Sequence, residues 1–196
     1  GKIPLQYQPG SRWHYSVSVD VLGYLIEVVS GMTLDQFFNE HIFRPLEMRD
    51  TAFWVPKDKI ARFATCYGPL SEQEKAEAGP DVKLKVIDHP KDSRYGTPAR
   101  LLSGGGGLVS TARDYMRFCQ MLLGGGQLAG ERLLKPATVV EMTRNQLPES
   151  AYPIGVGAGD RRDGVGFGLG LSVVVEQTEY TASSPVGECG WGGAAL

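Results

Sequence analysis

Between Gly164 and Leu171 every second residue is glycine, and the residues between the glycines are apolar. Successive side chains of an extended chain point to opposite faces, so this pattern predicts a strand with a bare glycine face and an apolar face. We expect another part of the chain to pack tightly against the glycine face. Apolar residues 173–175 follow, and a final strand over residues 189–196 is expected to pair with this strand in the antiparallel direction.

Residues 18–31 carry apolar side chains with the period of a helix. Four of them have the spacing of one buried helix face: Leu22, Leu25, Ile26 and Val29. Gly31 stands where a left-handed C-terminal cap is expected. Three further helices are predicted from capping residues and helix breakers. They begin at Thr33, at Ser110 or Thr111, and at Lys135, and they end before Pro45, at glycines 124–126 and near Pro148.

Residues 61–107 lose the helical period and are rich in Gly, Pro, Asp and Lys. An alternation of apolar residues from Val82 to Val86 predicts a short strand there. A long polar excursion of this kind often forms the lid or rim of a site, and a disordered surface loop is the alternative. We therefore divide the chain into a mainly helical region, 1–160, which contains this lid-like segment, and a region 161–196 with two antiparallel strands.

The charge balance excludes several partners. The 196 residues carry 20 Lys and Arg against 22 Asp and Glu, for a net charge of -2, and the longest basic run is Arg161-Arg162. Nucleic-acid binding needs clustered cations, so we expect no nucleic-acid partner. The apolar stretch 19–29 is interrupted by Asp20 and Glu27. It is far shorter than the ~20 apolar residues of a membrane span, so we expect no span.

The residue pattern predicts neither a metal site nor a cofactor site. Three cysteines and three histidines are scattered along the chain: Cys66, Cys119, Cys189, His14, His41 and His89. They form no C-x-x-C and no histidine ligand pair. The phosphate-binding motifs G-x-G-x-x-G and G-x-x-x-x-G-K are absent, and so is the G-x-S-x-G nucleophile elbow of common α/β-hydrolases. Cysteines that cannot all pair favour a reducing compartment, so we expect a cytoplasmic protein.

Five short motifs follow one another along the chain. They are P-G-S-R-W-H-Y-S at 9–16, D-V-L-G-Y-L-I-E-V-V-S-G at 20–31, I-F-R-P-L at 42–46, G-G-G-G-L-V-S-T-A-R-D-Y at 104–115 and W-G-G at 191–193. In this order the chain resembles the serine β-lactamase and penicillin-binding-protein superfamily, and most of all its carboxylesterase branch, the family VIII esterases. The resemblance implies an α+β, β-lactamase/transpeptidase-like fold, in which a helical region lies beside an antiparallel sheet flanked by helices, with the site between them.

The resemblance also implies acyl transfer through a serine ester, with no metal and no organic cofactor. Tyr15 matches the tyrosine of the family's second motif, which exchanges protons with the nucleophile. A phenol with an ordinary pKa of ~10 is a weak base at neutral pH, so in the family it is assisted by the Lys of a Ser-x-x-Lys motif. The third motif falls on Trp191, Gly192 and Gly193, which shape the substrate pocket. It leaves the backbone N–H of Ala194 to the oxyanion hole.

Two positions depart from the β-lactamase pattern. Val17 stands where Asn is usual, and Trp191 stands where a Lys-Thr-Gly motif begins. That lysine commonly holds a substrate carboxylate, so an indole in its place favours a neutral acyl substrate. We therefore expect a serine hydrolase of small-molecule carboxylic esters with short or medium acyl chains. A β-lactamase, a D-amino acid peptidase and a non-catalytic binding protein of the same fold are the alternatives.

The nucleophile of such an enzyme is not found in these residues. No Ser is followed three residues later by Lys; Ser71 with Lys75 has the wrong spacing, and Ser110 is followed by Arg113. We expect this chain to be part of a longer protein, whose N-terminal part carries Ser-x-x-Lys and whose C-terminal end supplies a further strand and helix.

Overall fold

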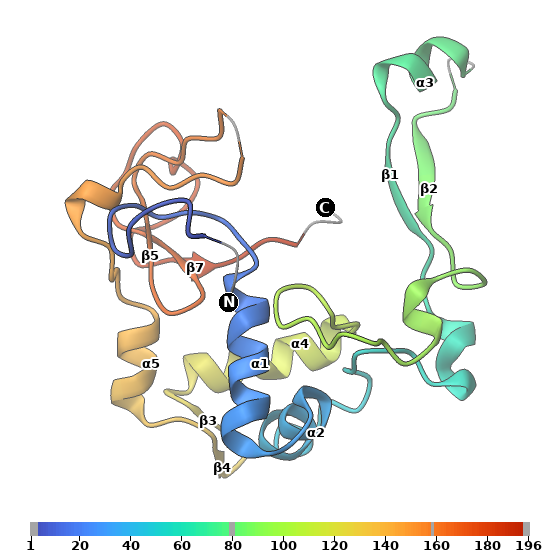
Figure 1. Cartoon of the computed structure of the whole chain (residues 1–196), viewed down its shortest axis with the longest axis horizontal. Helices are drawn as coiled ribbons and strands as arrows, with labels where there is room; N and C mark the ends of the chain where they lie inside the picture. Colours follow the sequence, from blue (N-terminus) through green and yellow to red (C-terminus); the bar gives the residue numbers. More distant parts are fainter. Residues whose placement is uncertain (1–3, 79–80, 158, 194–196) are drawn as a thin grey trace. The chain divides into compact units, whose positions relative to one another are not determined.

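The computed structural model describes residues 4–78, 81–157 and 159–193. The fold is α+β, with short helices and small antiparallel sheets (Figure 1). The chain groups into two compact units: unit 1 comprises residues 1–18 and 117–191, and unit 2 comprises residues 19–116 and 192–196. The division into 1–160 and 161–196 stays a prediction.

Unit 1 contains a three-stranded antiparallel sheet made of β5 (Val165–Phe167), β6 (Ser172–Val174) and β7 (Cys189–Gly190). The prediction of one long strand over the alternating glycines is wrong, because the chain turns between β5 and β6. Gly170 has a φ of +89°, which glycine adopts without strain, and the Gly168 N–H closes the turn on the Leu171 carbonyl at 2.7 Å.

The last strand is shorter than predicted, but its antiparallel pairing with residues near Val173 is confirmed. β7 pairs with β6, through Ser172 opposite Gly190 and Val173 opposite Cys189, and not with β5. Three short strands therefore take the place of the two predicted in this region. Residues 194–196 of the predicted final strand lie outside the described residues.

The close packing predicted on the glycine face is confirmed. A Cβ atom on Gly166 would overlap the side chain of Asn145 and stand 2.7 Å from the hydroxyl of Tyr152, and one on Gly168 would overlap the carbonyl of Met142. The Phe167 N–H donates to Asn145 Oδ1 at 3.1 Å. The segment that follows α5 (Pro136–Met142) therefore lies directly against the sheet.

Four more elements complete the path to this sheet. α4 (Ala112–Leu123) contributes residues to both units. Thr111 directly precedes this helix, and its hydroxyl accepts a hydrogen bond from the Asp114 N–H at 3.2 Å. A small hairpin of β3 (Gln127–Leu128) and β4 (Glu131–Arg132) follows, and a 3-10 turn spans Glu149–Ala151. The predicted helices at 112–123 and 136–142 are confirmed.

Unit 2 begins with α1 (Ser18–Ser30), of which Ser18 itself falls in unit 1, and α2 (Leu34–Phe38), continued by a π-helical turn (Asn39–Phe43). Both predicted helices are confirmed. Gly31 ends α1 with a φ of +70°, and the Thr33 N–H donates to Gln36 Oε1 at 3.3 Å, as a capping box requires. Three fully buried side chains form the core of this unit: Leu34, Leu46 and Phe53.

The buried face predicted for α1 is wrong for the part of the chain that the structure describes. Leu22, Leu25 and Val29 are 55%, 51% and 79% exposed. The helix instead packs at Gly23, where a Cβ would stand 2.9 Å from Leu34. Within the described residues no single helix is long and apolar enough to cross a membrane. α1 and residues 34–43 reach that length and composition as a pair, and they are bent by 84°.

The glycines of 104–107 allow a loop to approach the first turn of α1. The Ser103 hydroxyl donates to Asp20 Oδ1 at 2.5 Å. A Cβ on Gly104 would stand 2.5 Å from the Val19 carbonyl, so only glycine permits this contact.

The segment 61–107 contains more regular structure than predicted. After a 3-10 turn (Lys57–Arg62), β1 (Cys66–Pro69) and β2 (Leu84–Asp88) form an antiparallel hairpin with α3 (Glu72–Glu77) at its tip, and a last 3-10 turn spans Arg94–Gly96 (Figure 1). The predicted strand near Val82–Val86 is confirmed as β2. Its role as a lid stays a prediction.

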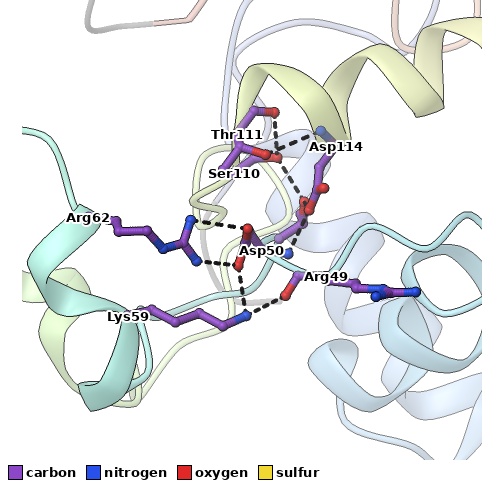
Figure 2. Close-up of polar contacts among 8 residues, drawn as sticks. Arg49, Asp50, Lys59, Arg62, Ser110, Thr111 and Asp114 are labelled. Atoms are coloured by element: carbon purple, nitrogen blue, oxygen red, sulfur yellow. Dashed lines mark hydrogen bonds and ion pairs between the residues drawn. The ribbon is translucent and has the colours of Figure 1, made fainter.

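Asp50 is the centre of a polar network in unit 2 (Figure 2). Its carboxylate accepts two hydrogen bonds from Arg62, at 2.7 and 3.2 Å, and pairs with Lys59 at 2.8 Å. Its backbone N–H donates to Asp114 at 2.6 Å, and the Thr51 hydroxyl donates to the same carboxylate at 3.0 Å. The network therefore ties the chain around Asp50 to the first turn of α4.

The network predicts a pH-dependent stability. The Arg62 hydrogen bond, followed by that of Lys59, lowers the pKa of Asp50 to about 2. A carboxyl with a lowered folded-state pKa stabilises the fold above its unfolded pKa of about 3.9, and loses this contribution as the pH falls towards 2. We expect Asp50→Asn to lower the urea midpoint at about pH 6, and the difference from the native protein to shrink between about pH 4 and pH 2.

The matched control is Asp81→Asn, because Asp81 is exposed. This variant should follow the native protein at every pH. A deficit of Asp50→Asn that is as large at about pH 2 as at about pH 6 would contradict the role of the Asp50 charge.

Candidate active site

The segment that carries Tyr15 directly follows a tight turn. The Ser11 N–H donates to the Gln8 carbonyl at 3.1 Å, with Pro9 and Gly10 at the corners and a φ of +80° at Gly10. This is the arrangement of a type II turn, which favours Pro and then Gly at these two positions. The motif P-G therefore sets the direction in which residues 12–15 run.

Alternation along the extended segment sends its side chains to two different places. Arg12 lies over the Tyr7 ring, 4.2 Å from its centroid, and the His14 ring contacts the same tyrosine at 5.3 Å. Trp13 and Tyr15 point the other way, with ring centroids 6.3 Å apart and an interplanar angle of 28°. The period of two residues expected of an extended chain thus places Trp13 beside Tyr15.

Four aromatic side chains of unit 1, Trp13, Tyr15, Phe167 and Trp191, meet in what we call the aromatic cluster. Tyr15 is stacked on Trp191, with centroids 5.8 Å apart and planes 24° apart. Trp13 contacts Phe167 at 5.3 Å and Trp191 at 6.1 Å, and Phe167 meets Trp191 edge-on at 5.4 Å. Each such pair contributes about 0.5–1.5 kcal/mol beyond the area that it buries.

Arg162 lies at the edge of the aromatic cluster. Its guanidinium carbon is 5.3 Å from the centroid of the Trp191 ring, within the range of a cation–π contact. Its Nε donates to Asp160 Oδ2 at 3.0 Å, and the same oxygen accepts the Val156 N–H at 2.7 Å. The Val156 N–H, followed by Arg162, lowers the pKa of Asp160. The carboxylate therefore stays charged and fixes the direction of the Arg162 side chain.

The structure brings together two of the predicted site residues. Tyr15 is 50% exposed, and its ring rests on the Trp191 ring. Gly192 and Gly193 follow Trp191 directly, are exposed and group with unit 2. Ala194, predicted to supply an oxyanion N–H, lies outside the described residues. The catalytic roles of all five residues stay predictions.

The sequence reasoning missed three residues of this site. Trp13 had a readable signal, because it stands two positions before Tyr15 and must share its face in an extended chain. Phe167 was read as one of several apolar strand residues. Nothing in the sequence singled out Arg162, since its approach to Trp191 depends on how the chain folds between them.

Cys189 is the cysteine that stands two residues before Trp191 in the sequence. Partial burial, and after it the charge of Glu188, raises the pKa of this thiol. A raised pKa disfavours the thiolate, which is the reactive form. Cys189 is therefore a poor nucleophile here. Within the described residues no three His, Cys, Asp or Glu side chains are grouped to hold a metal ion.

A hollow of about 80 Å³ in unit 2 borders the Asp50 network, with Lys59, Arg62, Trp54 and Phe63 in its wall. Both cations already engage the Asp50 carboxylate. A ligand would have to compete with these ion pairs, so we assign the network a structural role.

The fold is α+β, with short helices and small antiparallel sheets, and it is of the β-lactamase/transpeptidase type. The chain belongs to the beta-lactamase family, whose model matches residues 1–196. The resemblance read from the motifs is thereby confirmed.

Several known proteins are similar to most of this chain. Protein Rv1367c of Mycobacterium tuberculosis is 37% identical over 174 residues, 89% of this chain and 41% of that protein. Esterase EstB of Burkholderia gladioli is 30% identical over 195 residues, 97% of this chain and 46% of that protein. A solved structure of simvastatin synthase from Aspergillus terreus, the LovD6 mutant, is 26% identical with a TM-score of 0.74, over 95% of this chain and 45% of that one. The chain thus spans less than half the length of these proteins.

The aromatic cluster predicts a measurable stability. Phe167→Leu removes the ring that contacts both Trp13 and Trp191, so we expect the free energy of unfolding to fall by about 1–2 kcal/mol. Tyr180→Leu is the matched control, because Tyr180 is an exposed aromatic residue of the same unit and should change it by less than about 0.5 kcal/mol. Equal stabilities of the two variants in urea would show that the ring contacts contribute nothing.

Proposed function

We propose that the protein carrying this chain is a serine hydrolase of carboxylic esters with short or medium acyl chains, acting through an acyl-enzyme. The observation that carries the proposal is the half-exposed Tyr15 stacked on Trp191, in a member of the beta-lactamase family. The 30% identity to an esterase over nearly the whole chain supports the ester as substrate.

In this mechanism Tyr15 moves protons. The Tyr15 oxygen takes the proton of the serine hydroxyl while the serine oxygen bonds to the ester carbon. The alcohol then leaves with that proton as the carbon–oxygen bond of the ester breaks, and the acyl group stays on the serine. Water repeats the sequence in the second half and releases the acid. The serine and the lysine that lowers the cost of an ionised Tyr15 belong to the family's Ser-x-x-Lys motif.

Trp191 supports an apolar part of the substrate. Its indole stands at the position of the family's third motif, and the Trp13 and Phe167 rings extend the same apolar surface. An aromatic surface of this kind binds apolar acyl or alcohol groups through buried area and ring contacts.

The second candidate is a β-lactamase or a D-amino acid peptidase, which the name of the matched family favours. A chromogenic cephalosporin and a p-nitrophenyl ester, offered separately to the native gene product, distinguish the two. We expect turnover of the ester to exceed that of the cephalosporin. The same pair of assays detects a non-catalytic binding protein, which would turn over neither.

The decisive variant is Tyr15→Phe in the native gene product. Loss of a general base lowers the rate of the chemical step about 10²-fold or more. We therefore expect kcat for p-nitrophenyl butyrate to fall at least that far. Tyr180→Phe is the control, because Tyr180 is also half exposed and should leave kcat unchanged.

The thermal midpoint of each variant shows whether it is folded. A folded Tyr15→Phe protein that keeps kcat within about tenfold of the native value would remove Tyr15 from the mechanism.

A further inference from the structure

We infer that Arg162 holds an anionic group of the substrate, so that this site takes half-esters of dicarboxylic acids. The inference rests on the proposed function, because it places an ester beside Tyr15. It departs from the neutral substrate expected when Trp191 replaces the first residue of Lys-Thr-Gly. In the structure a cation, Arg162, does lie beside Trp191, although it comes from a different segment of the chain.

The first argument is geometric. Arg162 stands 5.3 Å from the Trp191 ring, which is itself stacked on Tyr15. A ligand that rests on the Trp191 ring beside Arg162 is therefore close to the guanidinium. The side chain of Arg162 is 26% exposed, so it is largely held in place and yet open to a ligand.

The second argument is the number of free hydrogen-bond donors. A guanidinium carries five N–H donors. Nε uses its donor on Asp160. Across residues 4–78, 81–157 and 159–193, the side chain of Arg162 donates no other hydrogen bond. With respect to these described residues, four donors thus remain, in the fork geometry that suits a carboxylate.

The third argument concerns the neighbouring charges. Arg161 pairs with Asp163, and Arg162 pairs with Asp160, so the four residues have no net charge. Long-range attraction of anions is therefore weak, and the selectivity for a carboxylate must come from directed hydrogen bonds. A half-ester fits this site because its apolar acyl chain can pack on the aromatic cluster. Its terminal carboxylate can then accept hydrogen bonds from Arg162.

The test compares mono-p-nitrophenyl adipate with p-nitrophenyl hexanoate, because the two acyl chains have equal length and differ in the terminal carboxylate. The native gene product and Arg162→Gln are assayed with both esters, after subtraction of the uncatalysed rates. We expect Arg162→Gln to lower the adipate-to-hexanoate ratio of kcat/KM about tenfold, mainly by raising KM for the adipate. Arg162→Lys keeps the positive charge but not the planar fork of donors. Its adipate-to-hexanoate ratio should lie between those of the native protein and Arg162→Gln.

The matched control is Arg161→Gln, which removes the adjacent arginine from its own ion pair with Asp163. Its ratio should equal that of the native protein. If Arg162→Gln lowers both rates by the same factor, Arg162 only supports the Trp191 ring and the inference is overturned. An unchanged ratio overturns it as well.

A binding measurement separates this inference from the proposed function. If the native protein hydrolyses neither ester, the proposed function fails. Binding of monomethyl adipate, followed by tryptophan fluorescence, then decides the inference: weaker binding by Arg162→Gln than by Arg161→Gln supports it, and equal binding overturns it.

Discussion

The Tyr15 ring rests on the Trp191 ring, and this contact joins the segment before α1 to the end of the sheet in unit 1. Both rings also touch Trp13, and Trp13 and Trp191 share Phe167. Without these contacts Tyr15 would stand on an exposed extended segment with no fixed direction. With these contacts made, Tyr15 is still half exposed.

The course of the backbone brings the rings of the aromatic cluster together. The turn at Pro9 and Gly10 sets the course of the extended segment, and its alternation turns Trp13 and Tyr15 to one side. In the sheet, β6 pairs with both β5 and β7. This brings Phe167, the last residue of β5, and Trp191, which directly follows β7, close enough for ring contact. The glycine face of β5 lets Asn145 approach and hold the strand from the other side.

Local patterns predicted the local structure well. The apolar period and Gly31 predicted α1, and the capping box at Thr33 predicted the next helix, because both signals act within a few residues. The burial of α1 could not be read from its period, since that depends on what packs against it. The turn at Gly170 was missed because alternating glycines suit a strand and a turn equally. Arg162 could not be found, because its partner Trp191 is distant in sequence.

The central claim is that Tyr15 serves a serine nucleophile in a Ser-x-x-Lys motif, which these 196 residues do not contain. Labelling the native gene product with a fluorophosphonate, followed by intact mass and peptide mapping, tests this claim most directly. The account predicts one covalent adduct, on a serine of a Ser-x-x-Lys sequence outside these residues. No adduct, or an adduct on a serine within these residues, would contradict it.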